Sequence, residues 1–222
     1  MSEFEEQKKI VLEAAKKFLK TGLTIGTSGN ISLRTGKKAM TMAITPSSRE
    51  YDELTIDDII VVDFSNEEDK IEVIEGKWSP SSETILHSLI YKKRKKINAI
   101  IHYHPVFSTA CGLVLNELPA ILDDQTFFLG GSIPITKDYA VSGSKELAYQ
   151  VQEAIAKTNA LIIRNHGAIG IGRNMDLAFE ACQLLEKTAK IYVYANLLGK
   201  DIKILNDKAI KNNTNIFKAI RF

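Results

Sequence analysis

The sequence has little of what marks the specialised classes of protein. Only two of its 222 residues are cysteines, Cys111 and Cys182, which is too few for a disulfide framework. The formal net charge of +2 gives no argument for a nucleic-acid or membrane partner. No apolar run approaches the ~20 residues that a membrane-spanning helix requires, and the N-terminus is acidic where a secretory signal would be basic and then apolar. We therefore expect a cytoplasmic protein whose two thiols stay reduced and buried.

The overall composition is that of an ordinary globular domain. Hydrophobic residues make up 45% of the chain and charged residues 25%. The length suits one sizeable core, and no composition shift, internal repeat or low-complexity segment divides it. We predict one domain over residues 1–200, followed by a C-terminal tail, residues 201–222. Because the tail is mixed in character and rich in lysine and asparagine, we expect it to be only partly ordered.

Hydrophobic periodicity predicts helices and strands that interleave without strict alternation. Residues 3–20 show the three-and-four spacing of an amphipathic helix, and Asn174 is placed to cap a long helix over 174–198. Several strands suit hairpin partners. We therefore predict a single three-layer α/β domain, with a central mixed, mostly antiparallel sheet and helices on both faces, over a doubly wound parallel fold. The other predicted helices are 82–95, 107–115 and 144–157, and the predicted strands are 31–34, 40–45, 59–63, 71–74, 97–104, 133–136, 160–164 and 168–170.

The predicted strand 97–104 ends in two histidines one residue apart, directly before Pro105. Because side chains on a strand alternate between its faces, His102 and His104 point to the same side. Two imidazoles held side by side are what a transition metal needs from its first two ligands. The pair alone is a weak signal, since histidine also serves as a satisfied, partly buried polar residue.

Two further segments could complete such a site. Glu83 opens the predicted helix 82–95, and His166 lies between the two short strands that follow residue 160. Three histidines and one carboxylate on separate elements could converge around zinc. Glu83 also has a simpler explanation, as a first-turn carboxylate that complements the helix dipole. As a ligand that can leave the metal, it would become a base.

Three clusters of hydroxyl-bearing residues stand at the ends of predicted elements. The first, Gly26-Thr-Ser-Gly29-Asn30, can present backbone N–H groups to an anion, although glycine and asparagine are also what tight turns require. It matches neither the Walker nor the dinucleotide-binding pattern. The other two are the segments 45–48 and 81–82, and the second lies at a helix start, where N–H groups are available. Three such clusters in one small domain favour a phosphate site.

Besides a metal ion, a lysine that forms a Schiff base can also support the making or breaking of a carbon–carbon bond, so the lysines are an alternative to the histidine site. A Schiff base needs a lysine desolvated in an apolar setting, whereas the lysines here lie mainly in polar runs or on helix faces, with Lys137 beside Asp138 no obvious exception. We expect the basic run 92–96 to be solvated cations at a helix C-terminus rather than a nucleic-acid patch. A structural zinc is disfavoured because closed sites usually use cysteines, and neither cysteine is near the histidine motifs.

Four motifs occur in the order in which they stand in the class II aldolase/adducin family, and the sequence resembles its L-fuculose-1-phosphate aldolase type. The likeness runs from the first helix to about Leu198. The motifs are Gly26-Thr-Ser-Gly-Asn30, Ser81-Ser-Glu83, His102-x-His104 and Asn165-His166-Gly167. The resemblance implies one zinc ion per subunit, held by Glu83, His102, His104 and His166. It also implies a substrate-phosphate site formed by Gly29, Asn30, Ser47, Ser48, Ser81 and Ser82.

The resemblance implies a zinc-dependent aldolase that reversibly cleaves a ketose 1-phosphate, similar to L-fuculose 1-phosphate, to dihydroxyacetone phosphate and an aldehyde. The bond would break through a metal-stabilised enediolate, with Glu83 moving the proton at C3. Family members are commonly C4 tetramers with active sites between subunits, so a homotetramer acting on a small sugar phosphate is expected.

The chain departs from the aldolases at two tyrosines. In the aldolases, a tyrosine from the adjacent subunit serves the aldehyde oxygen, a few residues after the proline that matches Pro119. This position holds Asp123, followed by Asp124, and we expect Asp123 to act as the acid there. A second aldolase tyrosine lies in the C-terminal tail, whereas the last tyrosine here is Tyr194.

Other functions within the family stay open. A ribulose-5-phosphate 4-epimerase or a methylthioribulose-1-phosphate dehydratase would share the metal chemistry but use another acid/base partner. A non-catalytic, adducin-like interaction domain would keep the fold and lose the site. This last function is disfavoured because all four ligand positions are filled.

Overall fold

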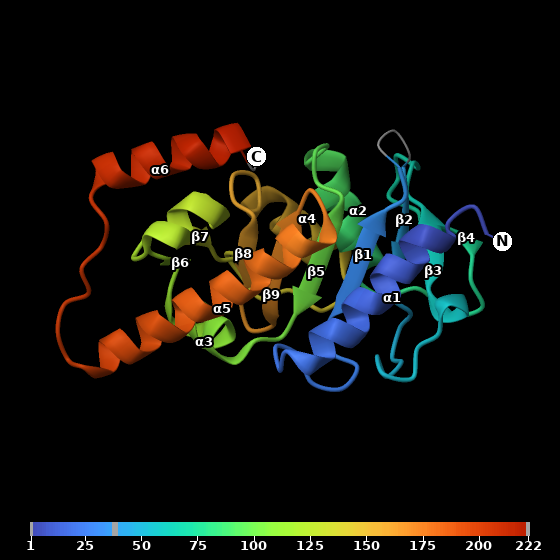
Figure 1. The fold of residues 1–222 in the computed structure, drawn as a ribbon, viewed down its shortest axis with the longest axis horizontal. Helices are drawn as coiled ribbons and strands as arrows, with labels where there is room; N and C mark the ends of the chain where they lie inside the picture. Colours follow the sequence, from blue (N-terminus) through green and yellow to red (C-terminus); the bar gives the residue numbers. More distant parts are fainter. Residues whose placement is uncertain (1, 37–39, 221–222) are drawn as a thin grey trace.

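The computed structural model describes residues 2–36 and 40–220, and its centre is a seven-stranded sheet (Figure 1). The strands stand in the order β4-β3-β2-β1-β5-β9-β8, and each neighbouring pair is antiparallel. Among the described residues, parallel pairing is limited to one bridge between Ile135 and Ile162. The strands are β1 (Asn30–Arg34), β2 (Thr41–Ile44), β3 (Ile60–Asp63), β4 (Glu72–Glu75), β5 (Ala99–Tyr103), β8 (Ala160–Ile163) and β9 (Gly167–Gly172).

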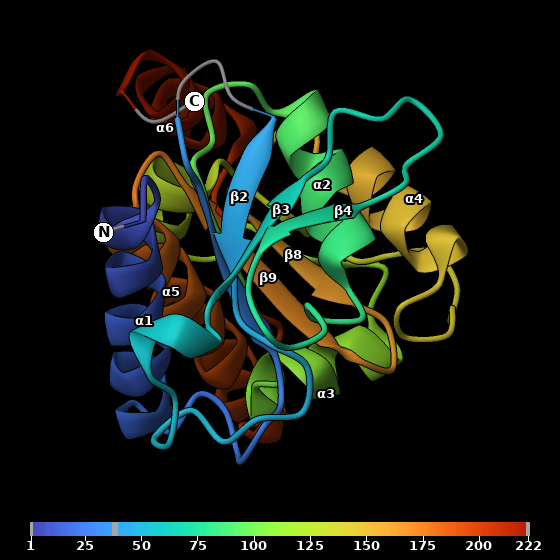
Figure 2. The ribbon, with the colours of Figure 1, turned by 90° about the vertical axis from the view of Figure 1, so that its right-hand side faces the viewer.

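Helices cover both faces of this sheet. Figure 2 shows α1 and α5 on one side and α2 and α4 on the other. The predicted three-layer α/β fold with a mostly antiparallel sheet is therefore confirmed. The helices are α1 (Glu5–Lys20), α2 (Thr84–Lys93), α3 (Val106–Val114), α4 (Lys145–Ala154), α5 (Met175–Leu197) and α6 (Asp207–Ile220), with short turns η1 (Ile56–Asp58) and η2 (Gln125–Leu129). A separate pair of two-residue strands, β6 (Glu117–Leu118) and β7 (Ile133–Pro134), completes the structure.

Alternation along the central strands separates two apolar cores and positions the histidines. Ile101 and Tyr103 of β5 pack in the core beneath α1, α3 and α5, whereas Ile100 packs in the core beneath α2 and α4. His102 therefore faces the α2 side, like Ile100. In the β1–β5 ladder, Asn30 pairs with His102, so both lie at the same end of the sheet.

Two predicted helix caps are confirmed. The Ser144 hydroxyl accepts a hydrogen bond from the Leu147 N–H at 3.1 Å, and α4 starts at the next residue. The Asn174 side chain accepts from the Leu177 N–H at 2.9 Å at the start of α5. A side-chain oxygen at this position satisfies one of the free N–H groups of the first turn.

The expectation that the C-terminal tail is only partly ordered is wrong for residues 207–220, and its last two residues, 221–222, lie outside the described residues. Residues from Asp207 form α6, which packs against η2, and its Phe217 is buried. Phe217 and Asn213 lie one helical turn apart and are the two buried residues, on one narrow face, of a helix whose isoleucines are exposed or only half-buried. The lysine- and asparagine-rich composition hides this narrow face. The division into a domain, 1–200, and a tail, 201–222, stays a prediction.

The basic run 92–96 is only partly solvated, contrary to expectation. Arg94 is buried, and its guanidinium donates to the carbonyl oxygens of Ile155 and Thr158 at 2.8 Å each. Lys92 pairs with Asp69 at 2.7 Å. Arg94 thus satisfies carbonyl groups left over at the C-terminus of α4, a role that charge counting along the sequence does not reveal.

The two cysteines and the hydropathy of the helices can be compared with what the composition predicts. Cys111 and Cys182 are both buried and neither forms a disulfide, as expected. Within the described ranges, 2–36 and 40–220, no helix is long and apolar enough to cross a membrane.

Candidate metal and substrate site

His102 and His104 lie at the end of β5 with their imidazole rings facing the same space. Their Nε2 atoms are 3.1 Å apart, which confirms that the two side chains point to one side. The Nδ1 atom of His102 lies 3.0 Å from the carbonyl oxygen of Ala168 on β9. Because a carbonyl only accepts, Nδ1 carries the proton and Nε2 of the neutral ring presents a lone pair to the site.

His166 reaches the same point from the turn between β8 and β9. The ring centroids of His166 lie 4.8 Å from His102 and 4.9 Å from His104. Asn165 adopts a left-handed backbone conformation, φ +58°, that asparagine tolerates, and this turns His166 toward β5. Gly167 follows, and a Cβ there would overlap the carbonyl oxygen of Tyr103 and approach Cδ2 of His104 to 2.8 Å. The Asn-His-Gly order thus lets three imidazoles meet.

Glu83 is the residue immediately before α2 and brings a carboxylate to the three rings. Its Oε2 lies 3.1 Å from Nε2 of His102, and its Oε1 lies 3.6 Å from Nε2 of His166. The amide of Asn30 donates to Oε2 at 2.9 Å, and the hydroxyl of Ser142 donates to Oε1 at 3.0 Å. The carboxylate is buried and held from both sides.

The protonation states of this cluster favour a cation. Burial lowers the pKa of His102 to about 4 and also lowers the pKa of His104, so both rings are neutral. Burial alone would raise the pKa of Glu83, but the attraction of a proton on the His102 ring and the hydrogen bond from Asn30 favour the carboxylate and hold this pKa below its ordinary value. An ionised Glu83 carboxylate therefore lies beside the neutral rings of His102 and His104.

The donor set fits a divalent metal ion. The unprotonated Nε2 of His102 is 3.1 Å from both a carboxylate oxygen and the Nε2 of His104, and facing acceptors repel unless a cation lies between them. The three imidazoles offer ligand atoms within 4.8 Å of one another. Three imidazoles with a carboxylate are a ligand set that zinc accepts. Ligation by these four residues, and the identity of the metal, remain predictions.

A cavity of about 220 Å³ opens beside this cluster and brings the three hydroxyl-rich segments together. Every residue predicted to hold phosphate lines it. The lining residues are Thr27, Ser28, Gly29, Asn30, Pro46, Ser47, Ser48, Ser81, Ser82, Glu83, His104, Ser142 and His166. Of the predicted metal ligands, only His102 does not itself line the cavity.

Asn30 and Ser142 have roles that the sequence does not reveal. Both groups of the Asn30 amide are engaged, because Nδ2 donates to Glu83 and Oδ1 lies 2.6 Å from Nε2 of His87. Ser142 precedes Gly143, whose positive φ of +76° and close approach to Ser82 fold the 138–144 segment against the cavity. A Gly-Ser pair before a helix indicates a turn, but not that the preceding serine reaches a carboxylate 59 positions away.

Asp123 does not line the cavity. It lies just before η2, where its carboxylate accepts a hydrogen bond from the Asn213 amide of α6 at 3.3 Å. Within one subunit, Asp123 is therefore placed against the C-terminal helix rather than beside the histidines. A role for Asp123 remains a prediction that requires a second subunit.

Gly29 fixes how closely the first loop approaches the histidine strand. Its φ is +88°, and a Cβ there would overlap the carbonyl oxygen of His102. We expect Gly29→Ala to lower the free energy of unfolding by about 3 kcal/mol, from left-handed strain and overpacking together. Urea denaturation measures this change. Gly26→Ala is the matched control, because Gly26 also has a positive φ but no atom lies within 4 Å of a new Cβ. Equal losses would show that the close approach is unimportant.

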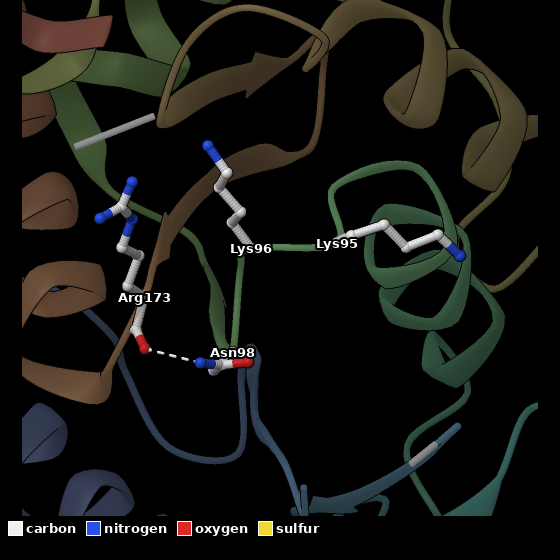
Figure 3. A pocket seen from close by; sticks show the side chains of 4 residues that line it. All are labelled: Lys95, Lys96, Asn98 and Arg173. Atoms are coloured by element: carbon white, nitrogen blue, oxygen red, sulfur yellow. Dashed lines mark hydrogen bonds between the residues drawn. The ribbon is translucent and has the colours of Figure 1, made fainter. Parts of the chain in front are cut away.

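A second, larger hollow of about 580 Å³ lies at the opposite end of β5 and β9 (Figure 3). It is lined by Lys95, Lys96, Asn98 and Arg173, and the Asn98 amide donates to the Arg173 carbonyl oxygen at 3.0 Å. Figure 3 shows Lys96 and Arg173 extending in a similar direction while Lys95 points away. With neither imidazole nor carboxylate in its lining, this hollow offers no metal ligands. The chemistry is therefore assigned to the cavity beside Glu83.

Comparison with known proteins identifies the family. The model of the class II aldolase and adducin N-terminal domain matches residues 9–193. The chain is 31% identical over 215 residues to the 5-deoxy-D-ribulose 1-phosphate aldolase of Bacillus thuringiensis, covering 97% of each chain. It is 30% identical over 200 residues to the L-fuculose phosphate aldolase of Escherichia coli K12, covering 90% of this chain and 88% of that protein. A solved structure of an L-fuculose 1-phosphate aldolase matches with a TM-score of 0.88 and 32% identity over 96% of each chain. The chain therefore belongs to the class II aldolase and adducin family, among its lyases.

Proposed function

We propose that this protein is a zinc-dependent class II aldolase that reversibly cleaves a ketose 1-phosphate to dihydroxyacetone phosphate and an aldehyde. One observation carries the proposal: His104, His166 and the ionised Glu83 carboxylate line the cavity that the hydroxyl-rich segments also line, and the His102 imidazole lies 3.1 Å from that carboxylate. The two relatives named above act on 5-deoxy-D-ribulose 1-phosphate and L-fuculose phosphate. A short ketose carrying a 1-phosphate is therefore the substrate class that we expect.

The predicted metal ligands are His102, His104, His166 and Glu83. Zinc bound there would polarise the ketose carbonyl and stabilise the negative charge that develops when the C3–C4 bond breaks. Glu83 is the only carboxylate in the cavity lining, and it is ionised, as a base must be. In the cleavage direction it returns a proton to C3, and in the condensation direction it removes that proton.

The phosphate would occupy the part of the cavity away from the histidines. The loop before β1, the turn after β2 and the start of α2 all contribute hydroxyl-bearing residues to the lining of this cavity. Ser47 and Ser48 are in the turn, where Ser48 adopts φ +54°. Backbone N–H groups at a helix start and in such turns bind anions without a lysine or arginine.

The assembly that we propose is a homotetramer with its active sites between subunits. Such an arrangement would let Asp123 of one subunit act as the acid or base at the aldehyde oxygen of its neighbour's substrate. Asp123 lies just before η2, outside its own subunit's cavity, and this placement is compatible with the role in trans.

The test is a product analysis with zinc-loaded protein. L-fuculose 1-phosphate and 5-deoxy-D-ribulose 1-phosphate are offered in parallel, and dihydroxyacetone phosphate is measured with a coupled dehydrogenase. We expect release from at least one of them, and we expect no aldehyde product from unphosphorylated L-fuculose, whose cleavage would give dihydroxyacetone instead. Ribulose 5-phosphate and methylthioribulose 1-phosphate serve as competing substrates. Epimerised or dehydrated sugar without dihydroxyacetone phosphate would replace the aldolase proposal with one of the other family reactions.

A further inference from the structure

A buried row of polar side chains runs from Glu83 into the space between β1 and α2. Asn30 and Ser32 lie two residues apart on β1, so they share one face of the strand. Glu83, His87 and Tyr91 are four residues apart, so they share one face of α2. Along the row, side chains from the α2 segment alternate with side chains from β1: Glu83, Asn30, His87, Ser32 and Tyr91 follow one another.

The contacts along this row are continuous. The Asn30 amide lies 2.9 Å from Glu83 Oε2 and 2.6 Å from His87 Nε2. His87 Nδ1 lies 2.6 Å from the Ser32 hydroxyl, which lies 2.9 Å from the Tyr91 hydroxyl. All five residues are at most 5% exposed. The row therefore forms a buried network behind the Glu83 carboxylate.

The chemistry of the groups fixes the direction of each hydrogen bond near Glu83. A carboxylate only accepts, so Asn30 must turn its NH₂ group to Glu83 and its carbonyl oxygen to His87. That oxygen also only accepts, so His87 must carry its proton on Nε2. Nδ1 of His87 then accepts from the Ser32 hydroxyl. Burial lowers the pKa of His87 to about 3, which keeps the ring neutral and leaves it in this single tautomer.

We propose that His87 is a positioning residue, which acts through Asn30 to hold the Glu83 carboxylate in the orientation needed for metal binding and proton transfer. Without the His87 N–H, the Asn30 amide has no fixed orientation, and a flipped amide would place its oxygen against the carboxylate. Groups that orient a metal ligand in this way typically change metal affinity or activity 10–100-fold when they are replaced. The inference rests on the proposed function of Glu83.

Two substitutions at position 87 separate positioning from packing. The amide nitrogen of Gln falls near the place of Nε2, so His87→Gln keeps a donor for Asn30. The shorter Asn falls near the place of Nδ1, so His87→Asn keeps a contact with Ser32 and loses the one with Asn30. Ser88→Ala is the matched control, because Ser88 is buried on the same helix and donates only to the Ile85 carbonyl oxygen.

The readouts are kcat and KM at saturating zinc and, independently, zinc affinity by competition with a chelator. We expect His87→Gln to stay within about threefold of the unmodified protein in all of them. We expect His87→Asn to lose about 10–100-fold in kcat, with little change in KM, and to bind zinc about tenfold more weakly. Similar effects in the Gln and Asn variants and in Ser88→Ala would overturn the proposal and leave His87 a packing residue.

A spectroscopic measurement tests the geometry without any substrate. Long-range ¹H–¹⁵N correlation spectra of the zinc-loaded protein report which ring nitrogen of His87 is protonated, and we expect Nε2. Protonation at Nδ1 would contradict the hydrogen-bond directions and overturn the proposal. If the unmodified protein cleaves no ketose phosphate, the proposed function fails, whereas the tautomer and the order of zinc affinities still decide the role of His87.

Discussion

Glu83→Gln is expected to lower kcat by about a thousandfold while most of the bound zinc stays in place. Gln has the shape of Glu but does not exchange a proton with C3, and a positioned acid or base contributes about 10²–10⁴-fold to a rate. The three imidazoles remain to hold the metal. Steady-state release of dihydroxyacetone phosphate gives kcat, and metal analysis after gel filtration gives the zinc content.

An exchange experiment isolates the proton-transfer role of Glu83. The unmodified protein should exchange a C3 hydrogen of dihydroxyacetone phosphate for deuterium in D₂O without any aldehyde, and Glu83→Gln should not. Glu75→Gln is the control, since Glu75 is a carboxylate on the edge strand β4 that pairs with Lys8. Undiminished exchange in Glu83→Gln would place the base elsewhere. Parallel loss of zinc and activity would make Glu83 a ligand only.

The parts of the site that the sequence predicts are those in which a local rule decides the geometry. His102 and His104 share a face because a strand alternates, and Ser144 and Asn174 cap helices because an oxygen is needed there. The family resemblance adds that Glu83 and His166 come to the same place, which no local rule states. The structure brings all four together and places the hydroxyl-rich segments around one cavity.

The parts that the sequence does not predict depend on contacts between distant segments. Ser142 reaches Glu83 across 59 positions, and His87 reaches Asn30 across 57. His87 sits among the apolar residues of α2, where a histidine is easily taken for a core residue. The sequence also fails to predict that α6 is ordered, because this too depends on a distant contact: α6 packs against η2, and its Phe217 is buried. The role predicted for Asp123 is not tested within one chain, because Asp123 does not line the cavity of its own subunit.

His104→Ala is expected to remove both the metal and the turnover. His104 is more exposed than His102, so its loss leaves the fold intact, but it leaves only two imidazoles for zinc, whereas Glu83→Gln keeps the set of three that can hold a catalytic zinc. We expect less than roughly a tenth of the normal zinc after gel filtration, and no detectable dihydroxyacetone phosphate.

A replacement ligand distinguishes loss of the metal from damage to the fold. His104→Cys restores a zinc-binding atom at the same position, so it should recover most of the bound zinc that His104→Ala loses. Circular dichroism should show equal secondary structure in both variants, because the His104 ring contacts the other two imidazoles rather than either apolar core. Normal zinc content in His104→Ala would mean that the three rings do not share one ion, and the predicted set of metal ligands would then be wrong.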